Sequence, residues 1–129
     1  MRIVHLNDVT SVETPFPGIT RKTLAYGDRM LAIQTILPKG TIASLHSHHH
    51  EQLSFCIKGR IEVSMEGETA ICEAGGSWVV PGDVEHAAQA LEDSLILEVF
   101  SPVRDLSLIH ISEPTSPRLI SYAVFCLKK

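Results

Sequence analysis

The sequence predicts an all-β domain, either a barrel or a sandwich of short strands. Apolar and β-branched residues gather in runs of about four to eight, and turn-forming residues follow at intervals of about eight to twelve. No stretch before residue 105 keeps a helical apolar period over several turns. A chain of 129 residues, 44% hydrophobic and 20% charged, has the size and composition of one globular domain.

The expected strands succeed one another along the chain, and each is stopped by residues that favour turns. Glycine adopts backbone angles that other residues avoid, and proline removes a donor from the strand ladder, so both mark strand ends. Such stops occur at residues 15–18, 27–28, 38–40, 58–59, 66–67, 75–76 and 81–83. Between them we expect strands at residues 3–6, 23–26, 30–37, 41–45, 53–57, 61–65, 69–72, 78–80 and 95–100.

The last part of the chain differs in character, so we expect residues 1–105 to form the domain and residues 106–129 a separate tail. The tail contains two apolar runs joined by a linker of Pro, Ser and Thr, with Glu113 as its single acidic residue. It resembles a peptide read through from an expression vector, and is then non-native and irrelevant to function. A native terminal hairpin is the alternative interpretation.

Charge and composition exclude several classes of partner. The net charge of -4 and the lack of a long basic run argue against nucleic acid. No apolar run approaches the roughly 20 residues that cross a membrane, and the amino terminus lacks the apolar core of a signal peptide. Cys56, Cys72 and Cys126 form no C-x-x-C pair and indicate free thiols. We therefore expect a cytoplasmic protein.

A histidine-rich segment at residues 40–59 is the strongest functional signal. Residues two apart in a strand point to the same face, so His46 and His48 can reach one interior together. Gln52 shares their parity, and His86 follows the Pro-Gly-Asp turn some forty residues later. Three imidazoles and a carboxamide oxygen would leave positions open for water or substrate, as in a catalytic metal site. A solvated surface run of histidines is the competing interpretation, and we assign His49 and His50 to the turn rather than to the ligands.

A second signal lies in the predicted strand at residues 95–100. Glu98 stands among apolar residues, and a buried unpaired carboxylate is costly, so it is a candidate general acid or base. Arg104 follows the Ser-Pro bend and could offer a guanidinium fork to a substrate carboxylate. The alternative is a structural pair between Glu98 and Arg104 at the rim of the barrel.

These segments resemble the two sequence motifs of the cupin family. The first motif, G-x5-H-x-H-x3-E-x6-G, is matched with glutamine in the place of its glutamate, and the second, G-x5-P-x-G-x2-H, with aspartate in the place of its second glycine. The resemblance implies a double-stranded β-helix (jelly-roll) barrel, usually dimeric, that holds one divalent Ni, Zn, Fe, Mn or Co ion. The matching residues are Gly40, His46, His48, Gln52, Gly59, Gly75, Pro81, Asp83 and His86.

One cupin subgroup is a closer resemblance, the pectin-degradation cupins that linearise unsaturated uronates. The shared features are HSHHHEQ, PGDVEH and the ending from Glu98 to Arg104. The resemblance implies Glu98 as acid or base, Phe100 as a packing wall and Arg104 on the uronate carboxylate. An iron cupin dioxygenase and a non-catalytic sugar-binding or metabolite-binding cupin are the alternative functions.

The outward parity of one predicted strand suggests how copies of the chain associate. Leu53, Phe55 and Ile57 lie on the face opposite to Gln52, where they form an apolar row. Exposed apolar rows of this kind are typical of interaction surfaces. We therefore expect a homodimer formed through this sheet.

Overall fold

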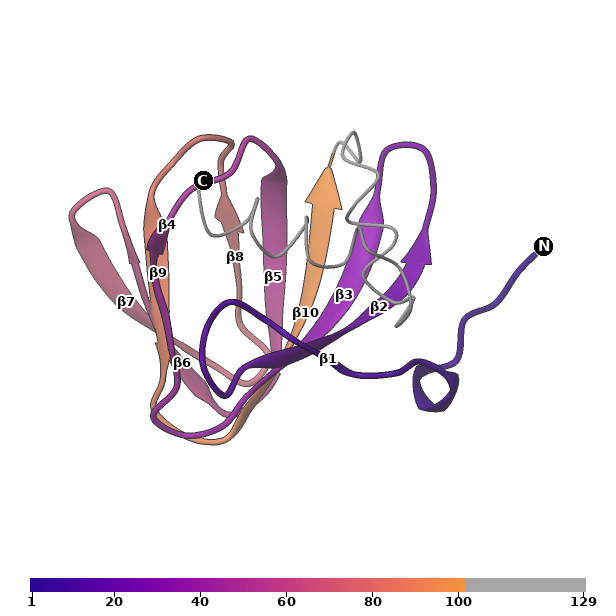
Figure 1. Ribbon diagram of the computed structural model, residues 1–129. Helices are drawn as coiled ribbons and strands as arrows, with labels where there is room; N and C mark the ends of the chain where they lie inside the picture. The colour runs from indigo at the N-terminus through magenta and orange to yellow at the C-terminus, as the bar shows by residue number, and fades with distance from the viewer. Residues whose placement is uncertain (102–129) are drawn as a thin grey trace.

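Two antiparallel β-sheets form the protein, in a computed structural model that describes residues 1–101. Six strands pair in the order β1-β2-β3-β10-β5-β8 and four in the order β4-β9-β6-β7. Figure 1 shows the two sheets facing each other, with the amino-terminal segment extending away from them. The strands are β1 (Val12–Glu13), β2 (Thr20–Tyr26), β3 (Leu31–Leu37), β4 (Ile42–His46), β5 (Glu51–Lys58), β6 (Arg60–Met65), β7 (Glu68–Glu73), β8 (Ser77–Val80), β9 (His86–Ala90) and β10 (Ser94–Ser101).

The prediction of an edge strand at residues 3–6 is wrong. A short 3-10 turn, Leu6–Asp8, occupies this region, and Ile3 is 66% exposed. The first paired strand is instead β1, which lies against β2. The segment at 3–6 has β-branched residues but no neighbouring strand to satisfy its backbone, and pairing is what makes a strand.

Strand β9, like the two-residue β1, is not predicted by the sequence pattern. Its sequence, HAAQA, contains mostly alanine, which has no preference for strands. It is held between β4 and β6, antiparallel to both. Two neighbours satisfy its backbone groups on both edges, so the tertiary structure decides its conformation.

The two sheets enclose an interior with an apolar end and a polar end. The apolar end contains Leu37, Cys56, Ile61, Ala90 and Ile96. The inward faces of β5 and β10 become polar toward the other end. On β5, Gln52 and Ser54 precede Cys56 on the same face, and on β10, Glu98 follows Ile96. The polar end is therefore the part of the barrel available for chemistry.

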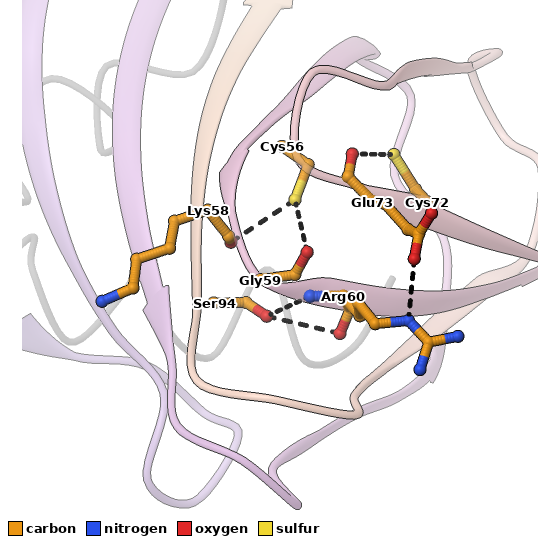
Figure 2. A network of polar contacts seen from close by, with 7 residues as sticks. All are labelled: Cys56, Lys58, Gly59, Arg60, Cys72, Glu73 and Ser94. Carbon is orange, nitrogen blue, oxygen red and sulfur yellow. Dashed lines mark hydrogen bonds and ion pairs between the residues drawn. The ribbon is translucent and has the colours of Figure 1, made fainter.

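The apolar end is closed by a tight turn between β5 and β6. Gly59 has φ 98°, and a Cβ there would lie 2.2 Å from the Ser94 hydroxyl. That hydroxyl accepts a hydrogen bond from the Arg60 backbone amide at 3.2 Å, while the Cys56 thiol donates to the Lys58 carbonyl at 3.4 Å (Figure 2). A side chain at Gly59 would break this closure, which explains why glycine ends the first motif.

Several expectations fall on residues beyond those described. The boundary at residue 105, the tail at 106–129 and Cys126 all lie outside the described residues. Within residues 1–101, Cys56 and Cys72 are free thiols as expected. No helix in that part of the chain is long and apolar enough to cross a membrane.

Candidate metal centre

Three histidines meet at the polar end of the barrel. His46 ends β4, His86 begins β9, and the two residues are register partners in the four-stranded sheet. His48 reaches them from the turn that leads into β5. The ring centroids of His46 and His86 lie 4.2 Å apart, and those of His48 and His86 lie 4.9 Å apart. One ligand nitrogen from each ring lies within 4.8 Å of the others, so the structure brings the three predicted histidines together.

Backbone carbonyls orient all three rings in the same way. The Nδ1 atoms of His46, His48 and His86 lie 2.7, 2.9 and 2.9 Å from the carbonyl oxygens of Ser44, His50 and Val84. A carbonyl can only accept, so the Nδ1 atoms of His46 and His86 carry the hydrogen and donate it. The Nε2 atoms of these two rings therefore keep a lone pair, which is the arrangement by which proteins present histidine to a metal.

Gln52 presents its carboxamide oxygen to the same point. Its nitrogen donates to the Ser54 hydroxyl at 2.9 Å and to the Glu98 carboxylate at 2.7 Å, which fixes the orientation of the amide. Its oxygen then lies 3.1 Å from His48 Nε2. A neutral imidazole carries one N–H, but both nitrogens of His48 face acceptors, the His50 carbonyl and this oxygen, so at one of them two lone pairs oppose each other. A cation that accepts both lone pairs would remove the repulsion.

The buried environment keeps two of these ligands neutral. Burial lowers the pKa of His86 to about 4, against the raising effect of the Val84 carbonyl. Burial also lowers the pKa of His46, with smaller contributions from His48 and Arg21. Neutral imidazole is the form that binds metal, so both residues stay competent at neutral pH.

The donor set fits a transition-metal ion. His86 Nε2 is buried and has no hydrogen-bond partner among residues 1–101. A buried polar atom without a partner is costly, and a metal ion is one group that satisfies it. The cluster of His46, His48 and His86 is therefore consistent with a metal site at the position that the sequence predicts.

A backbone hydrogen bond from one turn connects the second motif to the first. Asp83 donates its backbone N–H to the His48 carbonyl at 2.7 Å, and a Cβ at Gly82 would lie 2.6 Å from the His49 carbonyl. Asp83 has φ 66°, in the left-handed region that favours glycine. The glycine of the motif is thus a conformational requirement, and Asp is among the few other residues that tolerate it.

Glu98 lies beside the histidines, inside the barrel, as the alternation of β10 predicts. Its two oxygens accept hydrogen bonds from the Thr35 hydroxyl at 2.5 Å and from the Gln52 amide at 2.7 Å. Phe100, two residues further along the same face, is 6% exposed and sets its ring edge-on to His48 at 5.7 Å. Arg104 lies outside the described residues, so its role and its pairing with Glu98 stay predictions.

A cavity of about 80 Å³ connects these groups. The three histidines, Gln52, Glu98 and Phe100 all line it. Arg21 and Phe16 line it as well. The sequence pattern predicts neither, because residues 15–18 are expected to form a turn and the next strand is expected to begin only at residue 23. The signal was present: Ile19, Arg21 and Thr23 alternate with outward residues, which puts a cation on the inner face.

Residues 32–102 match the cupin domain family. The chain belongs to the cupins. It is 31% identical over 106 residues to the pectin degradation protein KdgF of Dickeya dadantii, covering 81% of this chain and 96% of that protein. It is also 29% identical over 103 residues to the L-ectoine synthase of Wolinella succinogenes, covering 77% of this chain and 79% of the synthase.

Solved structures agree with this family. The structure of KdgF from a Halomonas species matches with a TM-score of 0.76 at 32% identity, over 81% of this chain and 96% of that one. The expected all-β cupin barrel is therefore confirmed. The three converging histidines are consistent with a metal site in such a cupin.

Proposed function

We propose that this cupin is a metal-dependent isomerase that converts a 4,5-unsaturated uronate into its linear keto form. The observation that carries the proposal is one carboxylate, Glu98, held in the same cavity as three converging imidazoles. The similarity to KdgF, a pectin degradation protein, supports the substrate class, because pectin is built largely of uronic acid units.

The proposed reaction moves one proton and breaks one bond. The anomeric hydroxyl loses its proton, the bond between C1 and the ring oxygen breaks, and C4 gains a proton. The ring oxygen becomes the C5 ketone and C1 becomes the aldehyde, so no oxidant and no water are consumed. A single carboxylate that takes the first proton and returns it to C4 closes the balance.

Four residues of this chain would form the metal site. His46, His48, Gln52 and His86 would hold one divalent ion, with Ni, Zn, Fe, Mn and Co all compatible with imidazole and carboxamide donors. When bound, the ion supplies positive charge that polarises a substrate oxygen.

Glu98 would move the proton. Hydrogen bonds from Thr35 and Gln52 hold its carboxylate in one orientation toward the cavity, which limits exchange between rotamers. Phe100 would form an apolar wall that keeps water from the reacting carbon. Arg104 would offer its fork to the substrate carboxylate.

The test is a turnover assay with metal-loaded protein and an unsaturated galacturonate. The absorbance of the conjugated double bond should disappear faster than in buffer alone. Glu98→Gln should slow turnover by about 10²–10⁴-fold. The new amide can still accept from Gln52 and donate to Thr35, so fold and metal content should be unchanged. No acceleration by the wild-type protein would end the proposal.

The alternative functions give different results in the same preparation. An iron dioxygenase would consume oxygen when loaded with iron, whereas the isomerisation consumes none. A binding cupin would take up the sugar without changing its absorbance, and Glu98→Gln would then have no rate to reduce. Elemental analysis of the purified protein, with a His86→Ala variant beside it, tests the metal site separately.

A further inference from the structure

Arg21 places a fixed positive charge inside the barrel. It lies on the inner face of β2 between Ile19 and Thr23, and only 8% of its surface is exposed. It lines the same cavity as the histidines and Glu98. Its guanidinium is always charged and carries several N–H donors, so it can bind an anion inside the cavity.

Thr35, on β3, lies between the strands that carry Arg21 and Glu98. Arg21 is the direct partner of Thr35 across β2 and β3, and the Thr35 hydroxyl donates to Glu98. Glu98 is in turn bonded to Gln52, whose oxygen faces His48. A polar row of Thr35, Glu98, Gln52 and His48 therefore crosses the inner face from β3 through β10 to β5, in the cavity that Arg21 also lines.

The charge of the cavity favours an anionic ligand. Among the described lining residues, Arg21 is the fixed cation and Glu98 is the carboxylate, so their charges cancel. A divalent ion on the three histidines would make the cavity net positive. Guanidinium is also the side chain whose planar fork best matches a carboxylate.

We propose that Arg21 binds the carboxylate of an acidic sugar and thereby sets the orientation of that sugar in the cavity. The proposal rests on the proposed function and adds a specificity residue to it. A carboxylate at Arg21 would leave the rest of the ring in the cavity that Glu98 and the histidines also line. The rival explanation is that Arg21 only neutralises Glu98.

Binding of a sugar that cannot react separates these explanations. Galacturonate lacks the 4,5 double bond, and galactose is its neutral counterpart, so calorimetry with metal-loaded protein reports affinity without turnover. Wild-type protein should bind the acid more tightly than the neutral sugar. Arg21→Met should weaken the binding of galacturonate by about 10- to 100-fold and leave the affinity for galactose unchanged. Arg21→Lys keeps the charge without the fork and should give an intermediate loss.

Matched variants control for fold and charge. Lys22→Met removes a cation from the next residue of the same strand, where the ammonium bonds the Leu6 carbonyl on the outside, and should not change either affinity. Metal content by elemental analysis should be equal in all variants. If Arg21→Met fails to fold, the wild-type preference for galacturonate over its methyl ester and the loss in Arg21→Lys carry the test.

The outcomes distinguish this proposal from the isomerase proposal. An equal affinity of wild type for acid and neutral sugar overturns the role of Arg21, as does an equal loss for both sugars in Arg21→Met. It is also overturned if Arg104→Met abolishes the preference for the acid while Arg21→Met leaves that preference unchanged. A protein that shows the expected Arg21 dependence but does not accelerate loss of the double bond retains the carboxylate site and refutes only the isomerase.

Discussion

Replacing Gln52 by glutamate, the residue that the cupin motif usually carries, should place a proton between positions 52 and 98. In the wild type the Gln52 amide donates to the Glu98 carboxylate at 2.7 Å. In Gln52→Glu two carboxylates would face each other at that distance. Their repulsion is about 6 kcal/mol at an effective dielectric constant of about 20. Protonating an ordinary glutamate at pH 7 costs only about 3.7 kcal/mol, so the metal-free pair keeps one proton rather than two charges.

The consequence is a stability that falls as pH rises. Above the ordinary pKa of glutamate, the folded variant binds one proton more than its unfolded chain, because the pair raises the pKa of one carboxyl. The stability that this proton provides is lost as pH rises through the raised pKa. Between about pH 6.5 and 8 the free energy of unfolding should fall by about 1.4 kcal/mol per pH unit relative to wild type. Denaturant unfolding of chelator-treated protein at several pH values measures this slope.

A reversed pair provides the control. Gln52→Glu combined with Glu98→Gln restores one donor and one acceptor, so its unfolding free energy should follow that of the wild type across the same pH range. If the single variant is as flat as the wild type, the contact between positions 52 and 98 does not exist in solution, and the polar row inferred from it is refuted.

The other predictions concern the turn, the histidines and the outer sheet face. Asp83→Val should lose about 1–2 kcal/mol of stability because φ 66° is unfavourable for a β-branched residue, whereas Asp83→Gly should lose none; equal urea midpoints for the two variants would contradict this. His86 has its pKa lowered to about 4, so the unfolded chain binds more protons between about pH 6.5 and 4, and stability of the metal-free protein should be lost as pH falls through this window, by up to about 3 kcal/mol. His86→Gln should flatten that profile in denaturant titrations, and an unchanged profile would show that His86 is not the group responsible. Phe55 is 38% exposed on the row predicted to form the homodimer, so Phe55→Glu should raise the dimer dissociation constant by about 100-fold in a light-scattering dilution series. Ile71 is also apolar and is 45% exposed, but on the other sheet, so Ile71→Glu should leave the dissociation constant unchanged. A monomeric wild type would refute the dimer.

Local patterns were sufficient for the strands whose side chains alternate. In β5, Gln52, Ser54 and Cys56 are buried while Leu53 and Phe55 are exposed, as period-two alternation predicts. The pattern is reliable there because one face meets the core and the other does not. The same alternation could not predict β9, because its alanines show no contrast between an apolar and a polar face. It also could not exclude a strand at residues 3–6, because the absence of a strand there depends on the lack of a neighbouring strand.

The histidine cluster was predictable because its members lie at fixed motif spacings. Its geometry was not, since the orientation of each ring depends on the carbonyls of Ser44, His50 and Val84, which sequence spacing does not specify. Arg21 escaped prediction for a related reason: its sequence neighbours are ordinary, and its place opposite Thr35, whose hydroxyl donates to Glu98, follows from the register between β2 and β3.

The sequence by itself therefore determined the all-β class, the cupin motifs and the three histidines, because alternation and spacing are local properties of the chain. The tertiary structure alone decided how each imidazole is oriented, and that Thr35, Glu98, Gln52 and His48 form one polar row in the cavity that Arg21 also lines. These depend on pairing between β2, β3, β10 and β5, and pairing over long separations is set by the packing of the whole barrel.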